Sequence, residues 1–199
     1  MRTDPRHQAQ VLKCRWRTPA GVWRAPLRLL GREAYDLDAA SEDAADITVA
    51  TRRRLTPAQN ALTCQWFPAE QGMSGPASKR PLVWLNPPFG AVMGSLKSWS
   101  QTARAWATRG AVVAFYAPVF GDRWGDELEA AALTTIRVGG GRVRHLPPSG
   151  LQASSPQQHA HRIWMLGSAD LASTWPYAPR AVWDWRREVF TAPKLGSQK

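Results

Sequence analysis

Cysteine is scarce in this chain of 199 residues, which contains only Cys14 and Cys64. The two cysteines are far apart and lack the spacing of metal ligands, so we expect reduced thiols in a cytoplasmic protein, and a disulfide is not required. Long apolar runs are also missing, because no stretch approaches the ~20 residues of a membrane span. Residues 1–10 are polar, which argues against a secretory signal peptide.

Patterns typical of metal-dependent and nucleophilic enzymes are missing as well. His159 and His161 fall in a stretch expected to be a polar loop, without a cysteine or carboxylate that would complete a metal site. The chain also lacks a serine–histidine–aspartate motif. We therefore expect neither a metal ion nor a membrane among its partners.

Negative charge is in short supply, with 15 aspartates and glutamates against 26 lysines and arginines. The resulting formal net charge of +11 favours a polyanionic partner, most simply nucleic acid. The alternative is a basic protein without such a partner, because charge alone specifies neither a base sequence nor a reaction. The oligomeric state is left open.

Alternating helix and strand signals run along most of the chain. Helices are predicted over 20–30, 96–108 and 123–132, and strands over 34–37, 82–85, 111–116, 134–138 and 162–166. This alternation predicts an α/β fold with a mainly parallel central sheet. We expect a flexible arm over 1–13, one domain over 14–168 and a Trp- and Pro-rich extension over 169–199.

The most informative stretch is the apolar strand 82–85 followed by Asn86-Pro87-Pro88-Phe89. Proline has no backbone donor, so the strand must stop at Asn86 and leave an amide, carbonyl groups and an aromatic ring at its carboxyl end. Ligands of open α/β sheets bind at such ends. The amide and carbonyl oxygens suit the hydrogens of an exocyclic amine, and Phe89 offers a stacking face. The bland alternative is an ordinary Pro-Pro turn.

Further segments in the same order make the chain resemble the phage-type DNA N6-adenine methyltransferases. The match covers roughly residues 14–167. The matching segments are Trp16-Arg17-Thr18-Pro19, Tyr35-Asp36-Leu37-Asp38-Ala39-Ala40, Thr56 to Leu62 with Trp66, the Asn86 turn, Trp99, Gly110 to Pro118 and Gly141-Arg142-Val143. The resemblance implies a Rossmann-like S-adenosylmethionine-dependent methyltransferase fold. It also implies a cytoplasmic enzyme, in the host cytoplasm if a phage encodes it.

The resemblance assigns a cofactor site for S-adenosyl-L-methionine to Thr18, Pro19, Asp36, Asp38 and Ala39. Physically, free N–H groups at the helix start near Thr18 suit a carboxylate, and Asp38 at a strand end suits hydroxyls or a cationic amine. The alternatives are that Thr18 and Asp38 are only helix caps. The chain departs from the common pattern by having Ala39-Ala40-Ser41 in place of a glycine-rich loop.

Catalysis is assigned by the same resemblance to Asn86, Pro87, Pro88 and Phe89. Asn86 and the Pro87 carbonyl would accept the hydrogens of the adenine amine, and Phe89, where tyrosine is common, would stack on the base. Adenine must leave the duplex stack or arrive single-stranded. Candidate substrate contacts, with a solvated basic face as the alternative for the arginines, are Asn60, Arg52, Arg53, Arg54, Arg142 and Arg144.

Other functions on the same scaffold remain open at this point. Asn60 replaces an acidic residue that is frequent in the family, and an amide carries no charge. The alternatives are an N-methyltransferase acting on RNA or a protein amide, an enzyme with another base-modifying reaction, and a catalytically inactive nucleic-acid-binding protein. Cofactor binding separates the last of these from the others.

Overall fold

The computed structural model describes residues 17–41, 49–68, 73–88, 94–119, 121–146 and 159–191. The predicted arm over 1–13, Cys14 and Phe89 lie outside these residues.

A single seven-stranded sheet with the order β1-β2-β3-β5-β4-β6-β7 forms the centre of the fold. Its strands are β1 (Leu37–Asp38), β2 (Leu82–Leu85), β3 (Val112–Pro118), β4 (Ala132–Gly139), β5 (His161–Leu166), β6 (Arg180–Asp184) and β7 (Val189–Thr191). Three of the six pairings are parallel, namely β1–β2, β2–β3 and β4–β6. β5 is antiparallel to both β3 and β4, so β4 points the same way as β3. The chain is thus a mixed α/β protein, and the parallel part of the sheet is less extensive than predicted.

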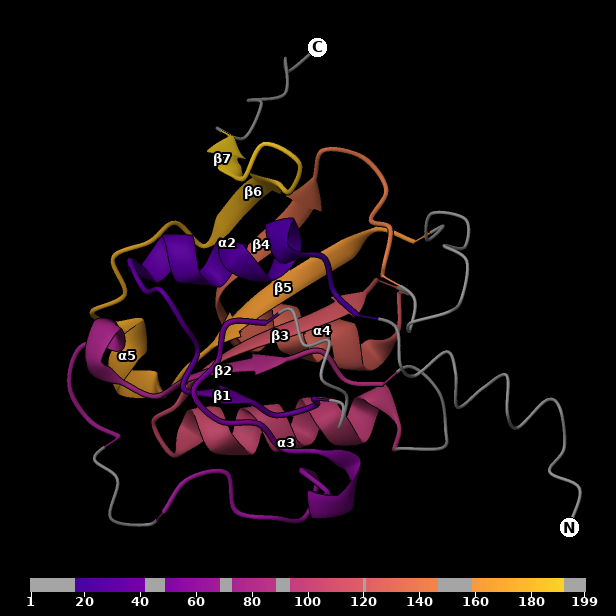
Figure 1. The fold of residues 1–199 in the computed structure, drawn as a ribbon. Helices are drawn as coiled ribbons and strands as arrows, with labels where there is room; N and C mark the ends of the chain where they lie inside the picture. The colour runs from indigo at the N-terminus through magenta and orange to yellow at the C-terminus, as the bar shows by residue number, and fades with distance from the viewer. Residues whose placement is uncertain are drawn as a thin grey trace, which may run out of the picture.

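Helices cover both faces of this sheet (Figure 1). α2 (Ala20–Leu30) lies on one face, and α3 (Leu96–Thr108) and α4 (Arg123–Ala131) lie on the other. The short α5 (Ala169–Ala172) and the 3-10 turns η1 (Pro57–Gln59) and η2 (Ala77–Lys79) complete the elements. Each face has its own buried core because successive side chains of a strand point to opposite sides. Trp84 and Tyr116 belong to the α2 side, and Leu85 and Phe115 to the α3 side.

Local signals place several elements where the sequence predicts them. α2 ends at Gly31, whose φ of 63° is the left-handed conformation that glycine adopts without a steric penalty. α3 begins after Ser95, whose side chain accepts a hydrogen bond from the Ser98 N–H. The predicted bounds of β2 and α3 are confirmed.

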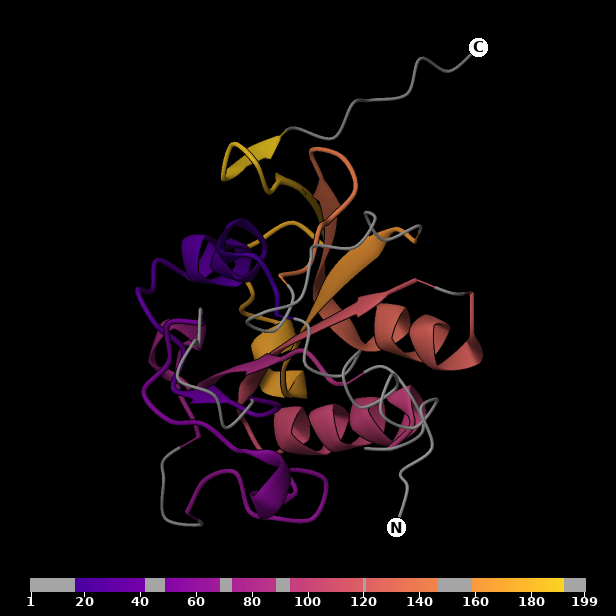
Figure 2. The same ribbon diagram turned by 45° about the vertical axis from the view of Figure 1, so that its right-hand side comes forward.

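The C-terminal segment from residue 169 contributes two strands to the sheet. β6 pairs with β4, and β7 pairs with β6. α2 packs against the turn between these strands at Gly21, where an added Cβ would lie 2.0 Å from the Trp185 carbonyl oxygen. The Trp183 indole N–H also donates to the Gly21 carbonyl. Helix and hairpin are therefore held in one body (Figure 2).

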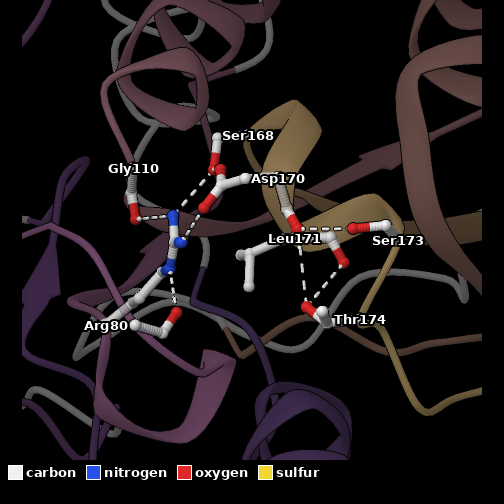
Figure 3. Close-up of polar contacts among 8 residues, drawn as sticks. Arg80, Gly110, Ser168, Asp170, Leu171, Ser173 and Thr174 are labelled. Carbon is white, nitrogen blue, oxygen red and sulfur yellow. Dashed lines mark hydrogen bonds and ion pairs between the residues drawn. The ribbon is translucent and has the colours of Figure 1, made fainter.

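Buried Arg80 connects loops at the amino end of the sheet (Figure 3). Its guanidinium donates to the Gly75 carbonyl at 2.7 Å and to Ser168 Oγ at 2.7 Å, and it also pairs with Asp170. The Arg80 side chain is 3% exposed, whereas that of Asp170 is 66% exposed. The loops before β2 and after β5 are thus joined through one charged group, on the edge opposite Asn86.

Candidate functional site

β1 has a parallel neighbour on each side, and both neighbours come later in the sequence, so the sheet has a topological switch point at this strand. On one side of β1, Tyr35 and Asp38 form parallel bridges with Thr51 and Arg54. On its other side β1 pairs with β2, which comes later in the sequence. Open α/β sheets bind ligands outside the carboxyl ends of strands at such a switch point. The residues that follow β1 and β2 therefore form the candidate site.

Asn86 follows β2 directly, and its side chain is held by Thr18. The Asn86 Nδ2 group donates to Thr18 Oγ1 at 2.8 Å. Asn86 Oδ1 is buried and has no hydrogen-bond donor among the described residues. A buried acceptor without a donor costs free energy. The amide is thus held by Thr18 while its oxygen has no donor among the described residues, and Thr18 and Asn86 are brought together as one unit.

α2 begins beside this pair. Its N-cap is Pro19, without a side-chain cap, and Ala20 is its first residue. The alternative role of Thr18 as the N-cap is therefore not realised, because the N-cap is Pro19, and the Thr18 hydroxyl accepts from the Asn86 amide. The first N–H groups of a helix lack intrahelical acceptors and carry partial positive charge. Residues Thr18 and Pro19 thus stand where a carboxylate would be stabilised.

Asp38 ends β1 on the α2 side of the sheet, next to Trp84 in β2. Neighbouring strands ~4.8 Å apart with a ~3.3 Å rise place the Cα atoms of Asp38 and Asn86 about 8 Å from each other. Burial raises the pKa of Asp38 to about 7, against the opposing effects of the Ala40 N–H and the Arg54 charge. Ala39 is buried, and its N–H donates to the Trp84 carbonyl. Asp38 is therefore a carboxyl group that would gain from a cationic ligand.

A cluster of Tyr116, His145 and His161 lies on the α2 face of the sheet. The sequence did not single out Tyr116 and His145, and it considered His161 only as a metal ligand. Tyr116 is near the end of β3, and its hydroxyl is 3.3 Å from His145 Nε2. His161 stacks on the Tyr116 ring at 5.2 Å between centroids. Burial lowers the pKa of His145 to about 4 and, together with the charge of His145, that of His161 to about 3. Both imidazoles are therefore neutral at neutral pH.

The prediction that His161 belongs to a polar loop is wrong. His161 is the first residue of β5 and is buried, because β5 extends one residue further than the apolar run indicates. His145 Nδ1 and His161 Nε2 have no hydrogen-bond partner among the described residues. An alternation of arginines with Val143 and His145 is the sequence signal that could have placed His145 inside.

Two of the predicted site residues lie at the opposite edge of the sheet. Asp36 accepts from the Leu82 N–H at 2.8 Å, at the start of β2. It also pairs with Arg32 at 2.7 Å and with Arg52 at 3.5 Å. Both carboxylate oxygens of Asp36 are thus engaged in contacts that fix the amino end of the sheet. The structure separates Asp36 and Arg52 from Asn86.

Three other predicted substrate contacts precede β2 in the sequence, namely Asn60, Arg53 and Arg54, and they do not form one cluster. Asn60 is exposed with φ 47°, and its Oδ1 accepts from the Leu62 N–H, which are features of a turn residue. Leu62 lies against Gly94, at the start of the segment that leads into α3. Arg53 is exposed with its guanidinium over the Phe67 ring, and half-buried Arg54 lies beside Asp38.

Arg142 and Arg144 are exposed on the segment that follows β4. The matched segment Gly141-Arg142-Val143 is not part of a strand. Leu146, a few residues later, forms a single antiparallel bridge with Arg17, with two hydrogen bonds of 2.9 Å. Because Thr18 follows Arg17, this segment runs along the carboxyl edge up to the Thr18–Asn86 pair.

No protein-family model, curated protein or solved structure matches the chain. Among the described residues no helix is long and apolar enough to cross a bilayer. The same residues contain no group of three or more histidine, cysteine or acidic side chains placed to hold a metal ion. Any functional assignment therefore depends on the geometry of the site and on the sequence motifs.

Proposed function

We propose that this protein is a DNA N6-adenine methyltransferase that uses S-adenosyl-L-methionine, on a Rossmann-like methyltransferase fold. The observation that carries the proposal is the buried Asn86 Oδ1 atom, an acceptor without a donor among the described residues, beside the switch point of the sheet. Two further observations support it. Asp38 is a buried carboxyl group about two strand positions away, and the uncapped start of α2 is adjacent.

The residues at this edge fit the chemical groups of the cofactor. The N–H groups at the start of α2, after Thr18 and Pro19, suit its carboxylate, and Asp38 suits its ammonium group or its hydroxyls. When bound, S-adenosylmethionine supplies an electrophilic methyl group. Ala39 follows Asp38, where a glycine-rich loop is common, and it already donates its N–H to the Trp84 carbonyl, so the proposal gives this N–H no hydrogen bond to the cofactor.

Asn86 and the residues after it act on the adenine amine. Its nitrogen is a weak nucleophile because the lone pair is delocalised into the ring. Asn86 Oδ1 accepts a hydrogen bond from one N–H of the amine, and the Pro87 carbonyl accepts one from the other N–H. These two hydrogen bonds favour tetrahedral geometry at the nitrogen. Stacking on the base is assigned to Phe89 by the resemblance alone. Thr18 fixes the orientation of the amide, so that positioning supplies much of the rate.

Transfer of labelled methyl groups from S-adenosylmethionine to unmethylated duplex DNA tests this proposal. Wild type should form N6-methyladenine, and Asn86→Ala should lower the rate at least ~100-fold by removing an acceptor from the reacting amine. Thr18→Val should lower the rate of methyl transfer roughly tenfold or more, because the Asn86 amide is no longer held in place. Thr18→Ser keeps the hydroxyl and should retain activity.

Asn60→Gly is the control for a substitution near the site, and we expect a small effect from it because Asn60 lies in an exposed turn and glycine adopts its positive φ without strain. Cofactor binding without methylation of DNA would redirect the assignment to RNA, a protein amide or another modification. Absence of cofactor binding by calorimetry would refute the enzymatic assignment and leave a nucleic-acid-binding protein.

A further inference from the structure

The carboxyl edge of the sheet continues beyond the site into an arginine-rich surface. β4 and β6 both point in the direction of β3, so their carboxyl ends lie on the same edge as Asn86. The turn after β4 and the turn between β6 and β7 therefore lie side by side, as Figures 1 and 2 show. We call the exposed arginines of these two turns the edge surface: Arg142, Arg144, Arg186 and Arg187.

Two hydrogen bonds and close backbone packing join these two turns. The Trp185 indole N–H donates to the Gly141 carbonyl at 3.3 Å, and its backbone N–H donates to the Gly139 carbonyl at 3.3 Å. A Cβ added to Gly140 would lie 2.3 Å from Asp184 Oδ1, and one added to Gly141 would lie 3.1 Å from an Arg186 guanidinium nitrogen. The guanidinium of Arg186 thus lies close to the turn that follows β4 and over the Trp185 ring.

An extended segment carries this surface to the site. Between Gly141 and Leu146, Val143 and His145 are buried, whereas Arg142 and Arg144 are exposed. The alternation places both arginines on the outer side, ~6.6 Å apart along the chain. The segment then pairs with Arg17, whose neighbour Thr18 holds Asn86. A continuous line of residues therefore connects the hairpin with the candidate catalytic amide.

The balance of charge on the edge surface is positive. Within the described residues no carboxylate lies at ion-pair distance from Arg142, Arg144 or Arg186. Asp184 lies 3.8 Å from Arg187 and accepts hydrogen bonds from two backbone N–H groups of the turn. Glu188 pairs with Arg24 of α2 at 2.7 Å. The nearby carboxylates are thus occupied, and at least three guanidinium groups remain for a polyanion.

We infer that the edge surface binds the phosphate backbone of DNA and delivers the strand to Asn86, with Arg186 and Arg187 of the β6–β7 hairpin as phosphate contacts. Guanidinium groups suit phosphate through charge and paired N–H donors. Delivery of the strand to Asn86 rests on the proposed function, whereas binding of the phosphate backbone to the edge surface does not. The inference assigns a role to the C-terminal hairpin, for which the sequence indicated none.

Fluorescence anisotropy with a labelled mixed-sequence DNA duplex tests the inference. The variant is Arg186→Gln/Arg187→Gln. The charge-matched control is Arg104→Gln/Arg109→Gln, in α3 and at its C-cap, on the face of the sheet that α3 covers. The hairpin variant should weaken binding roughly tenfold at low salt and reduce the slope of log K against log salt by about 2. Arg186→Lys/Arg187→Lys should restore most of the affinity because it keeps the charge.

Circular dichroism and thermal unfolding establish that each variant is folded. Equal loss of affinity in the hairpin and α3 variants would overturn the inference, because it would show a net-charge effect. DNA binding by wild type with no loss in the hairpin variant would also overturn it, while leaving methyl transfer intact. Conversely, a specific loss of DNA binding in a protein that transfers no methyl group would support the surface and refute the enzymatic proposal.

Discussion

Replacing His145 with phenylalanine should remove part of the acid sensitivity of this fold. His145 and His161 are buried beside Tyr116, and burial lowers their pKa values to about 4 and about 3. In the unfolded chain a histidine has a pKa of ~6.5. Below that pH the unfolded state binds protons that the folded state does not, so the free energy of unfolding decreases as the pH decreases.

The size of the effect follows from the lowered pKa of His145. Between pH 8 and pH 5 the unfolded chain takes up its proton almost fully, whereas the folded state, with a pKa of about 4, takes up little. Because pH 5 lies about 1.5 below the pKa of an unfolded histidine, proton uptake by the unfolded chain lowers the free energy of unfolding by about 2 kcal/mol. Asp38 acts in the opposite direction. Burial raises its pKa to about 7, so its contribution to stability is present in acid and is lost as the pH rises through 7.

Urea unfolding of wild type and His145→Phe at pH 8 and pH 5 measures this difference. Asp38 contributes similarly to both proteins. Burial is the main cause of the lowered pKa of His161 and the charge of His145 a secondary one, so most of the difference between the two proteins belongs to His145. Loss of the contact with Tyr116 lowers stability at both pH values, but the variant should lose about 2 kcal/mol less than wild type on acidification. Tyr116→Phe removes the same contact and keeps both imidazoles, so it should show the wild-type pH dependence. If the stability of His145→Phe depends on pH as that of wild type does, the conclusion that His145 is neutral and buried in the folded protein is refuted.

Two further predictions concern the opposite edges of the sheet. Binding of S-adenosylmethionine near Asp38 should release a proton, so affinity should increase as the pH rises through about 7, and Asp38→Asn should abolish this dependence in calorimetry. Replacing buried Arg80 with methionine should destabilise the protein by about 3 kcal/mol in urea, because Ser168 Oγ and the Gly110 carbonyl lose their donor. Asp170→Asn should lower the free energy of unfolding less than Arg80→Met does, since the Asp170 side chain is 66% exposed. Equal losses would contradict the role of Arg80 as the donor to these buried acceptors.

The central elements could be predicted because strong local signals bound them. Two prolines end β2, Ser95 caps α3, and the apolar run of β3 is buried along its full length. The C-terminal strands gave no such signal. In β6 only Trp183 is fully buried, and the three residues of β7 are exposed, so neither strand shows a clear alternation of apolar and polar residues. The antiparallel insertion of β5 depends on tertiary pairing.

The sequence predicts the central residue of the candidate site, but it does not predict which residues that side chain contacts. Asn86 follows from the strand and the prolines, but its partner Thr18 is 68 residues away and has the sequence pattern of a helix cap. Asp36 and Asp38 look equivalent in the sequence, yet only Asp38 lies at the carboxyl edge, because Asp36 is bonded to the start of β2. Asn60 resembles a substrate contact by its position in the motif, whereas its positive φ is a backbone requirement.

The carboxyl edge separates two electrostatic environments, and this separation is what the proposed reaction needs. Inside, His145 and His161 are kept neutral by burial, and Asp38 is a buried carboxyl group near the Asn86 amide. Outside, the edge surface presents arginines to solvent. A cationic methyl donor is favoured by the first environment and a phosphate backbone by the second. Because the extended segment that ends at Leu146 belongs to both, with histidine inward and arginine outward, a strand bound outside would be held within a few residues of the buried acceptor.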